Sequence, residues 1–157
     1  MYGYGDEMHR VTRKVLRGFN PPRFKALRVS AMSLSDLVRL SGVTASTIYA
    51  WEAGTSTPQV DKLAAAMKAL GSSIDDVVEV PIEERFPGDW RVLAGFTQPQ
   101  LAAAAAISTT GLQRIESGER APTDEQAATL SRLLGTDAQQ YQAAWQRARH
   151  RPPGTPA

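Results

Sequence analysis

Residues 37–58 read LVRLSGVTASTIYAWEAGTSTP, and the same pattern returns at residues 101–122 as LAAAAAISTTGLQRIESGERAP. A constant shift of 64 positions aligns the two stretches without a gap. Each stretch is followed by an amphipathic run that ends in Leu-Gly, at residues 70–71 and 134–135. Self-similarity at a fixed spacing is the signature of a repeated structural unit. The sequence therefore predicts that one small fold occurs twice in the chain.

The start of each repeat carries the signals of a helix N-terminus. Ser33 is followed three residues later by Asp36, and Thr97 is followed in the same way by Gln100. Side chains in this pattern bond backbone N–H groups that the first turn of a helix leaves without partners. Pro99 stands within the first turn, where its missing N–H costs little. We therefore expect one helix to begin after Ser33 and another after Thr97.

A tight turn and a second helix follow in both repeats. Gly42 is expected to end the first helix of the first repeat, because glycine readily adopts the left-handed conformation. The second repeat has Ala105 and Ala106 at this point, so its turn must bend without a glycine. Thr44 and Ser108 are placed to cap the next helix. Two short helices joined by a tight turn form a helix-turn-helix arrangement.

Further positions complete a recognisable pattern in each repeat. In the first repeat they are Ser33, Leu37, Gly42, Val43, Thr44, Ile48, Trp51, Glu52, Gly54 and Pro58. In the second they are Arg91, Gly95, Phe96, Thr97, Gln98, Leu101, Ile107, Ser108, Ile115, Glu116, Gly118 and Pro122. With these residues, both repeats resemble the Cro/C1-type helix-turn-helix family of phage repressors and related bacterial regulators. The resemblance implies an all-α fold of two small five-helix, lambda-repressor-like bundles.

Composition shifts along the chain predict its domain organisation. We expect a flexible basic arm at residues 1–22, helix-turn-helix domains at 23–78 and 90–150, an acidic, Pro-containing linker at 79–89 and a disordered tail at 151–157. Residues 72–89 carry a net charge of −5, whereas residues 23–71 carry +3. Phosphate contacts are therefore expected from the basic amino-terminal half and not from the linker. The arm is interpreted either as a segment that follows DNA or as a solvated leader.

Apolar spacing places the remaining helices. They are expected at residues 23–31, 60–70 and 74–78 in the first repeat, and at residues 123–134 and 137–150 in the second. The first repeat departs from the family pattern, because the spacing from Leu27 to Ser33 is one residue shorter than usual. The spacing from Trp90 to Thr97 in the second repeat is the usual one.

The resemblance also implies which residues face DNA. Carried over position by position, they are Ala45, Ser46, Thr47, Tyr49 and Ala50 in the first repeat, and Gln98, Thr109, Thr110, Gln113 and Arg114 in the second. Gln113 suits adenine and Arg114 suits guanine, each with about 1–3 kcal/mol of discrimination. The first set offers only hydroxyl and apolar groups, and Leu34 stands at the position of Gln98. We therefore predict that the second repeat carries base specificity and that the first supplies mostly backbone affinity.

Several function classes find no support in the sequence. It contains no cysteine, and its two histidines, His9 and His150, are far apart, so neither a disulfide nor a metal site is expected. No catalytic set, phosphate-cradling glycine loop or cofactor motif occurs, and Glu52 and Glu116 are interpreted as structural hydrogen-bonding residues. No apolar run is long enough to span a bilayer, and no signal peptide is recognised. The sequence thus indicates a soluble cytoplasmic protein without enzymatic activity, cofactor or small-molecule ligand.

The predicted function is a sequence-specific double-stranded DNA-binding transcriptional regulator. The specific form is a phage- or prophage-type repressor that reads two half-sites with its two repeats, about 34 Å or a multiple of it apart. One alternative is an antitoxin-like or other interaction module, in which one repeat binds DNA and the other docks a protein partner. Another is a coactivator bridge with no base reading of its own. The sequence leaves open a homodimer or a protein partner, and whether transcription is activated or repressed.

Overall fold

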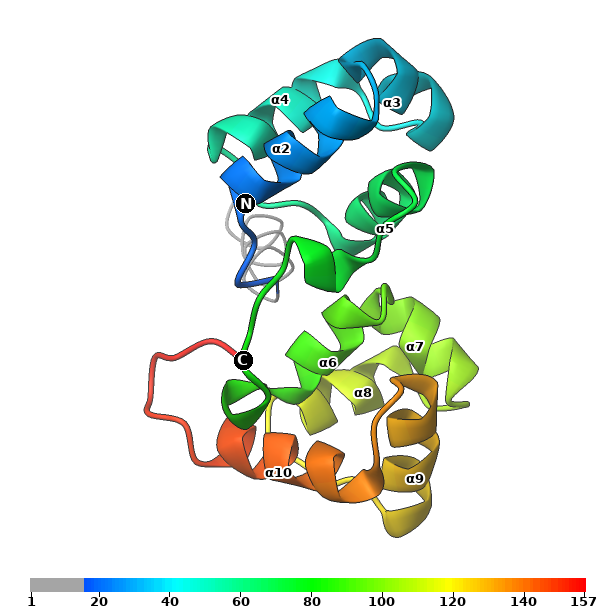
Figure 1. The fold of residues 1–157 in the computed structure, drawn as a ribbon. Helices are drawn as coiled ribbons and strands as arrows, with labels where there is room; N and C mark the ends of the chain where they lie inside the picture. The colour runs from blue at the N-terminus through cyan, green and yellow to red at the C-terminus, as the bar shows by residue number, and fades with distance from the viewer. Residues whose placement is uncertain (1–15) are drawn as a thin grey trace, which may run out of the picture. The chain divides into compact units, whose positions relative to one another are not determined.

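The computed structural model describes residues 16–157, and the chain divides into two compact units, of which the first ends at Glu79 and the second begins at Val80 (Figure 1). Their regular structure is helical apart from one isolated antiparallel bridge between Phe19 and Val78. This agrees with the expected all-α fold. Within the same residues no helix is long and apolar enough to cross a membrane.

Among its described residues, the first unit contains four α-helices and one short 3-10 turn. They are α2 (Pro21–Ala31), α3 (Leu34–Ser41), α4 (Ala45–Ala53), α5 (Val60–Ala69) and η1 (Ile74–Asp76). Its interior is centred on aromatic rings, since Phe24 and Trp51 meet edge to face with their centroids 5.5 Å apart. Leu37, Ile48 and Leu63 are fully buried around them. Burial of these side chains is the main force that holds the short helices together.

The amino-terminal boundary of the first unit differs from the expectation. Most of the predicted arm, residues 1–15, lies outside the described residues. Leu16 is buried in the unit, and Asn20 caps α2 by accepting from the N–H of Arg23. Residues 16–22 therefore belong to the fold of the first unit.

The helix expected at residues 74–78 is wrong, because only residues 74–76 form a single 3-10 turn. The Val77 carbonyl accepts from Asn20 N–H at 2.8 Å, and Glu79 N–H donates to Gly18 O at 2.9 Å. These backbone groups are therefore used in pairing with the segment before α2, and the chain extends instead of coiling.

The second unit repeats this plan. Its elements are η2 (Ile82–Glu84), α6 (Pro87–Leu93), α7 (Gln98–Ala104), α8 (Thr109–Glu116), α9 (Asp124–Leu133) and α10 (Ala138–Arg149). The segment expected as a linker, residues 79–89, contains η2 and the first turn of α6. Asp89 is buried, and its carboxylate accepts from the N–H of Phe86 at 2.8 Å to cap α6. Pro87 occupies the first position of the helix, where its fixed φ is favourable.

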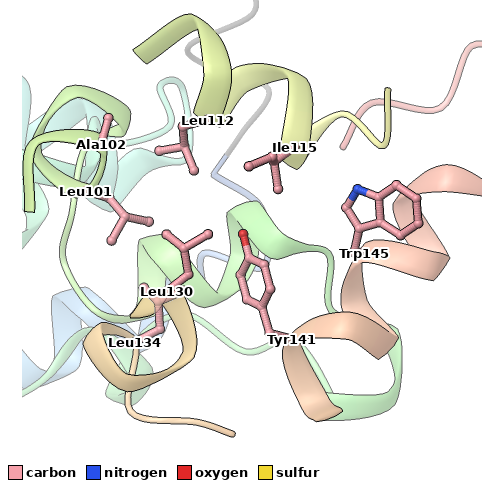
Figure 2. Close-up of a cluster of buried hydrophobic side chains, with 8 residues drawn as sticks. All are labelled: Leu101, Ala102, Leu112, Ile115, Leu130, Leu134, Tyr141 and Trp145. Carbon is pink, nitrogen blue, oxygen red and sulfur yellow. The ribbon is translucent and has the colours of Figure 1, made fainter. Parts of the chain in front are cut away.

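A single apolar cluster forms the core of the second unit (Figure 2). It consists of Leu101, Ala102, Leu112, Ile115, Leu130, Leu134, Tyr141 and Trp145. The Tyr141 hydroxyl points toward Leu112 and Ile115 on α8, and it has no hydrogen-bond partner within the described residues. Its burial raises the pKa of Tyr141 well above the ordinary value. This core cluster therefore contains a buried hydroxyl that has lost its hydrogen bonds to water without forming others.

The tail at residues 151–157, expected to be disordered, is tied to the second unit. Arg151 donates to Ser117 O at 2.6 Å and to Thr155 O at 2.7 Å. Arg149 donates to Gly118 O at 3.1 Å. The Ser117 and Gly118 carbonyls follow the end of α8, where acceptors lack helical partners. The two arginines therefore cap α8.

Candidate nucleic-acid interface

Each unit contains one of the two predicted helix pairs. We call α3 with α4 the first head, and α7 with α8 the second head. Ser33 accepts from Asp36 N–H at 3.1 Å, and Thr97 forms both bonds of a capping box with Gln100. The expected helix starts at these caps are thus confirmed. Ser108 accepts from Gly111 N–H at 2.9 Å and opens α8 in the same way.

Ten residues were expected to face DNA, and all of them lie on the heads with at least partial exposure. Those that are exposed are Ala45, Ser46, Tyr49, Thr110, Gln113 and Arg114. Those that are half-buried are Thr47, Ala50, Gln98 and Thr109. None belongs to the core, which leaves each of them accessible for a contact.

Hydroxyl groups cluster at the start of α4 in the first head. Thr44 Oγ1 lies 2.8 Å from Thr47 Oγ1 and 3.3 Å from Ser46 Oγ. Tyr49 is the large side chain of this surface and is 60% exposed. The surface thus presents hydroxyl groups and one phenol, with no amide or cation among the residues expected to face DNA.

A buried ion pair lies beneath the second head. Arg91 and Glu116 form two parallel hydrogen bonds of 2.8 and 3.2 Å, and their side chains are 3% and 5% exposed. Such fork-to-fork pairing satisfies both carboxylate oxygens in a fixed plane. The pair joins α6 to the end of α8 and so sets the position of that helix against the unit.

A chain of hydrogen bonds extends from this pair to the surface. Gln98 Nε2 donates to Glu116 Oε1 at 2.8 Å, and Gln113 Nε2 donates to Gln98 Oε1 at 3.4 Å. Because a carboxylate only accepts hydrogen bonds, Gln98 must turn its NH₂ group toward Glu116. Its carbonyl oxygen then faces Gln113. The buried charge therefore fixes the orientation of an exposed amide on α8.

The first unit has an equivalent ion pair but lacks the hydrogen-bond chain that leads from it to the surface. Arg28 bonds Glu52 at 2.8 and 3.0 Å, and this hydrogen bonding raises the pKa of Arg28. Leu34 occupies the position of Gln98 and has no amide to extend the network. Together the two ion pairs confirm the structural interpretation of Glu52 and Glu116.

Sequence reasoning missed Arg28, and the shortened spacing in the first repeat explains why. Only one residue, Met32, separates the end of α2 from Ser33, whereas three residues separate α6 from Thr97. A constant shift of 64 aligns Arg91 with Leu27, yet the spatial equivalent is Arg28. The one-residue difference in spacing is the sequence signal from which Arg28 could have been found as the partner of Glu52.

The side chains of residues 16–157 form no candidate metal site. No group of three or more histidine, aspartate or glutamate side chains is placed to hold a metal ion there. Arg147, near the end of α10, donates to Arg85 O at 2.8 Å.

Comparison with known proteins agrees with the geometry of both heads. The helix-turn-helix family model matches the chain twice, at residues 24–77 and at residues 89–140. The two matches together cover more than half of the chain. Among curated proteins, none matches it.

Proposed function

We propose, because this chain belongs to the Cro/C1-type helix-turn-helix family of DNA-binding transcription regulators, that it represses transcription by reading two half-sites of one operator. Each head contributes the start of its second helix, α4 or α8, to a major groove. The second head carries most of the base specificity, and the first supplies mostly backbone affinity. The protein acts in a bacterial cytoplasm as a phage- or prophage-type repressor.

The observation that supports this division is the hydrogen-bond chain from Glu116 through Gln98 to Gln113. An amide held in one orientation pairs with adenine without first losing rotational freedom. Arg114, exposed one residue further along α8, adds a bidentate donor suited to guanine. No corresponding chain exists in the first head, where Leu34 replaces the glutamine.

The first head is suited to contacts that carry little sequence information. Ser46, Thr47 and Tyr49 offer hydroxyl groups, which bond phosphate oxygens without regard to the base. Ala45 and Ala50 offer methyl groups that suit a thymine methyl. A weak head joined to a specific one still raises overall affinity through effective concentration, provided that the connection spans both half-sites.

The test is a selection of genomic fragments by the purified protein, followed by footprinting. A bipartite footprint is expected, with half-site centres about 34 Å or a multiple of it apart. Gln113→Ala with Arg114→Ala should abolish sequence preference at one half-site, about 1–3 kcal/mol for each lost pair. The matched control, Ser46→Ala with Tyr49→Ala, should weaken binding with the preference retained. Equal base preference at both half-sites would refute the division.

A second candidate function is supported by apolar exposure on the first unit. Leu40 on α3 is 54% exposed and Tyr49 on α4 is 60% exposed. Exposed apolar side chains of this size suit a protein contact at least as well as a phosphate. In an antitoxin-like or other interaction module, this head docks a protein partner and only the second head binds DNA. A single half-length footprint that survives deletion of the first unit would favour this candidate.

A further inference from the structure

Gly111 is the third residue of α8, and the guanidinium of Arg120 lies where its side chain would be. A methyl group on Gly111 would lie 3.0 Å from Arg120 Nη2 and 2.9 Å from Ser108 Oγ. Contacts this short are closer than a side chain ordinarily makes, so the arrangement depends on glycine. The loop after α8 thus sends a cation back over the beginning of the same helix.

Two hydrogen bonds hold the backbone of Arg120 in place. Its N–H donates to Arg114 O at 3.1 Å, and its carbonyl accepts from Trp145 Nε1 at 3.1 Å. Trp145 belongs to the core cluster and is only 8% exposed. The position of Arg120 is therefore set by α8 on one side and by the core on the other.

The charge of Arg120 has no partner within residues 16–157. The residue is exposed, and no carboxylate or carbonyl of these residues pairs with its guanidinium. Arg149 and Arg151, by contrast, bond carbonyls at the end of α8. A cation beside the positive amino-terminal end of a helix is repelled by the helix dipole, whereas an anion placed there is attracted by both.

We propose that Arg120 binds a DNA phosphate beside the start of α8, through the space that Gly111 leaves open. The inference rests on the proposed function of the second head and adds to it a residue outside the ten expected contacts. It also gives Gly111 a role: its missing side chain admits the guanidinium next to the bases that Gln113 and Arg114 read.

The first head has no equivalent of the Gly111 and Arg120 arrangement. A shift of 64 places Thr47 at the position of Gly111 and Ser56 at the position of Arg120. Thr47 has a side chain that lies 2.8 Å from Thr44 Oγ1, and Ser56 has neither charge nor length. The proposed phosphate contact is therefore specific to the second head.

The test measures binding of the full chain to the duplex recovered by selection, across a range of salt concentrations. Arg120→Ala should weaken binding about five- to tenfold at ~0.1 M salt and lower the salt slope by about 1, because one fewer counterion is released. The loss should be similar for duplexes that differ in base sequence, since a phosphate carries no sequence information. Arg132→Ala is the matched control, because Arg132 is exposed at the end of α9 in the same unit. Its salt slope should equal that of the wild type.

The role of Gly111 is tested by Gly111→Val, which fills the space that the guanidinium uses. It should lower the salt slope as much as Arg120→Ala does, and the double variant should lose no more than either single one. Additive losses would overturn the positioning argument. Circular dichroism and the thermal midpoint establish whether each variant is folded, and Arg120→Gln repeats the test without shortening the side chain greatly.

Failure of this inference can be told apart from failure of the proposed function. If the wild-type protein binds a defined duplex and Arg120→Ala leaves the salt slope unchanged, the proposed phosphate contact is wrong. The proposed function as a DNA-binding regulator is then unaffected. If the wild-type protein binds no duplex DNA, the proposed function itself is wrong.

Discussion

Ala106 adopts a φ of 59° at the position where Gly42, in the first unit, has a φ of 75°. Both residues end the first helix of a head in the left-handed conformation, which confirms that the second turn bends without a glycine. For a residue with a Cβ atom this conformation costs about 1–2 kcal/mol. The second head therefore contains a strained turn that the first head avoids.

Ala106→Gly should relieve this strain and raise the stability of the second unit by about 1 kcal/mol. The gain is smaller than the full strain, because glycine also loses more freedom on folding. Gly42→Ala should lower the stability of the first unit by a similar amount, although no atom within 4 Å would meet its methyl group. Differential scanning calorimetry of both variants checks the pair. A lower thermal midpoint for Ala106→Gly would contradict the strain argument.

Tyr141→Phe should stabilise the second unit by about 1 kcal/mol, because it removes a buried hydroxyl that has no partner and keeps the packing of the ring. The folded state raises the pKa of this phenol, so ionisation above about pH 10 favours the unfolded chain. The stability of the wild type is therefore unaffected by this titration below about pH 10 and falls as the pH rises beyond it. The variant should therefore lose less stability than the wild type in alkaline solution. Denaturant titrations at neutral pH and above pH 10 measure both effects, and equal alkaline losses would refute the second.

Glu116→Gln should destabilise the second unit by about 3 kcal/mol, because it leaves the Arg91 guanidinium buried opposite a neutral amide. Glu52→Gln in the first unit should cost less, since the Arg28 side chain is 12% exposed and retains more access to water than that of Arg91, which is 3% exposed. Urea unfolding of the two variants provides the comparison. The ordering is wrong if Glu52→Gln proves the more damaging change.

Local signals predicted most of the two heads. Capping residues such as Ser33 and Thr97 placed helix starts correctly, because they act within one turn of the chain. The errors arose where distant backbone decided the outcome. The segment after Ser73 has a helical sequence, but its end pairs with Gly18 and Asn20, which no local pattern reveals.

The finer contacts of the site were also beyond sequence reasoning. The positions of Gln98 and Gln113 followed from the family resemblance, but their hydrogen-bond chain to Glu116 depends on side chains from two helices of the second head. The relation of Arg120 to Gly111 spans a loop, and no spacing rule indicates that the Arg120 side chain covers Gly111. Alignment of the two repeats located the surface expected to face DNA, whereas the structure shows which of its side chains bond one another.

Gln98→Leu gives the second head the residue that Leu34 supplies in the first, and it should weaken the preference of Gln113 for one base over the others. The change removes the acceptor that holds the Gln113 amide, so that side chain must be ordered on binding at a cost of about 0.5–1.5 kcal/mol. A free amide also flips to suit other bases. Affinity for the preferred operator should therefore fall more than affinity for operators altered at the base that Gln113 reads.

The measurement is a set of binding titrations against operators substituted one base pair at a time. Gln139→Leu is the matched control, because Gln139 is an exposed glutamine on α10. Glu116 keeps both hydrogen bonds to Arg91 in the Gln98→Leu variant, so the fold should persist, and a thermal melt verifies it. An unchanged ratio between preferred and altered operators would show that Gln113 reads its base without help from Gln98, and the specificity of the second head would then rest on Arg114 and on Gln113 alone.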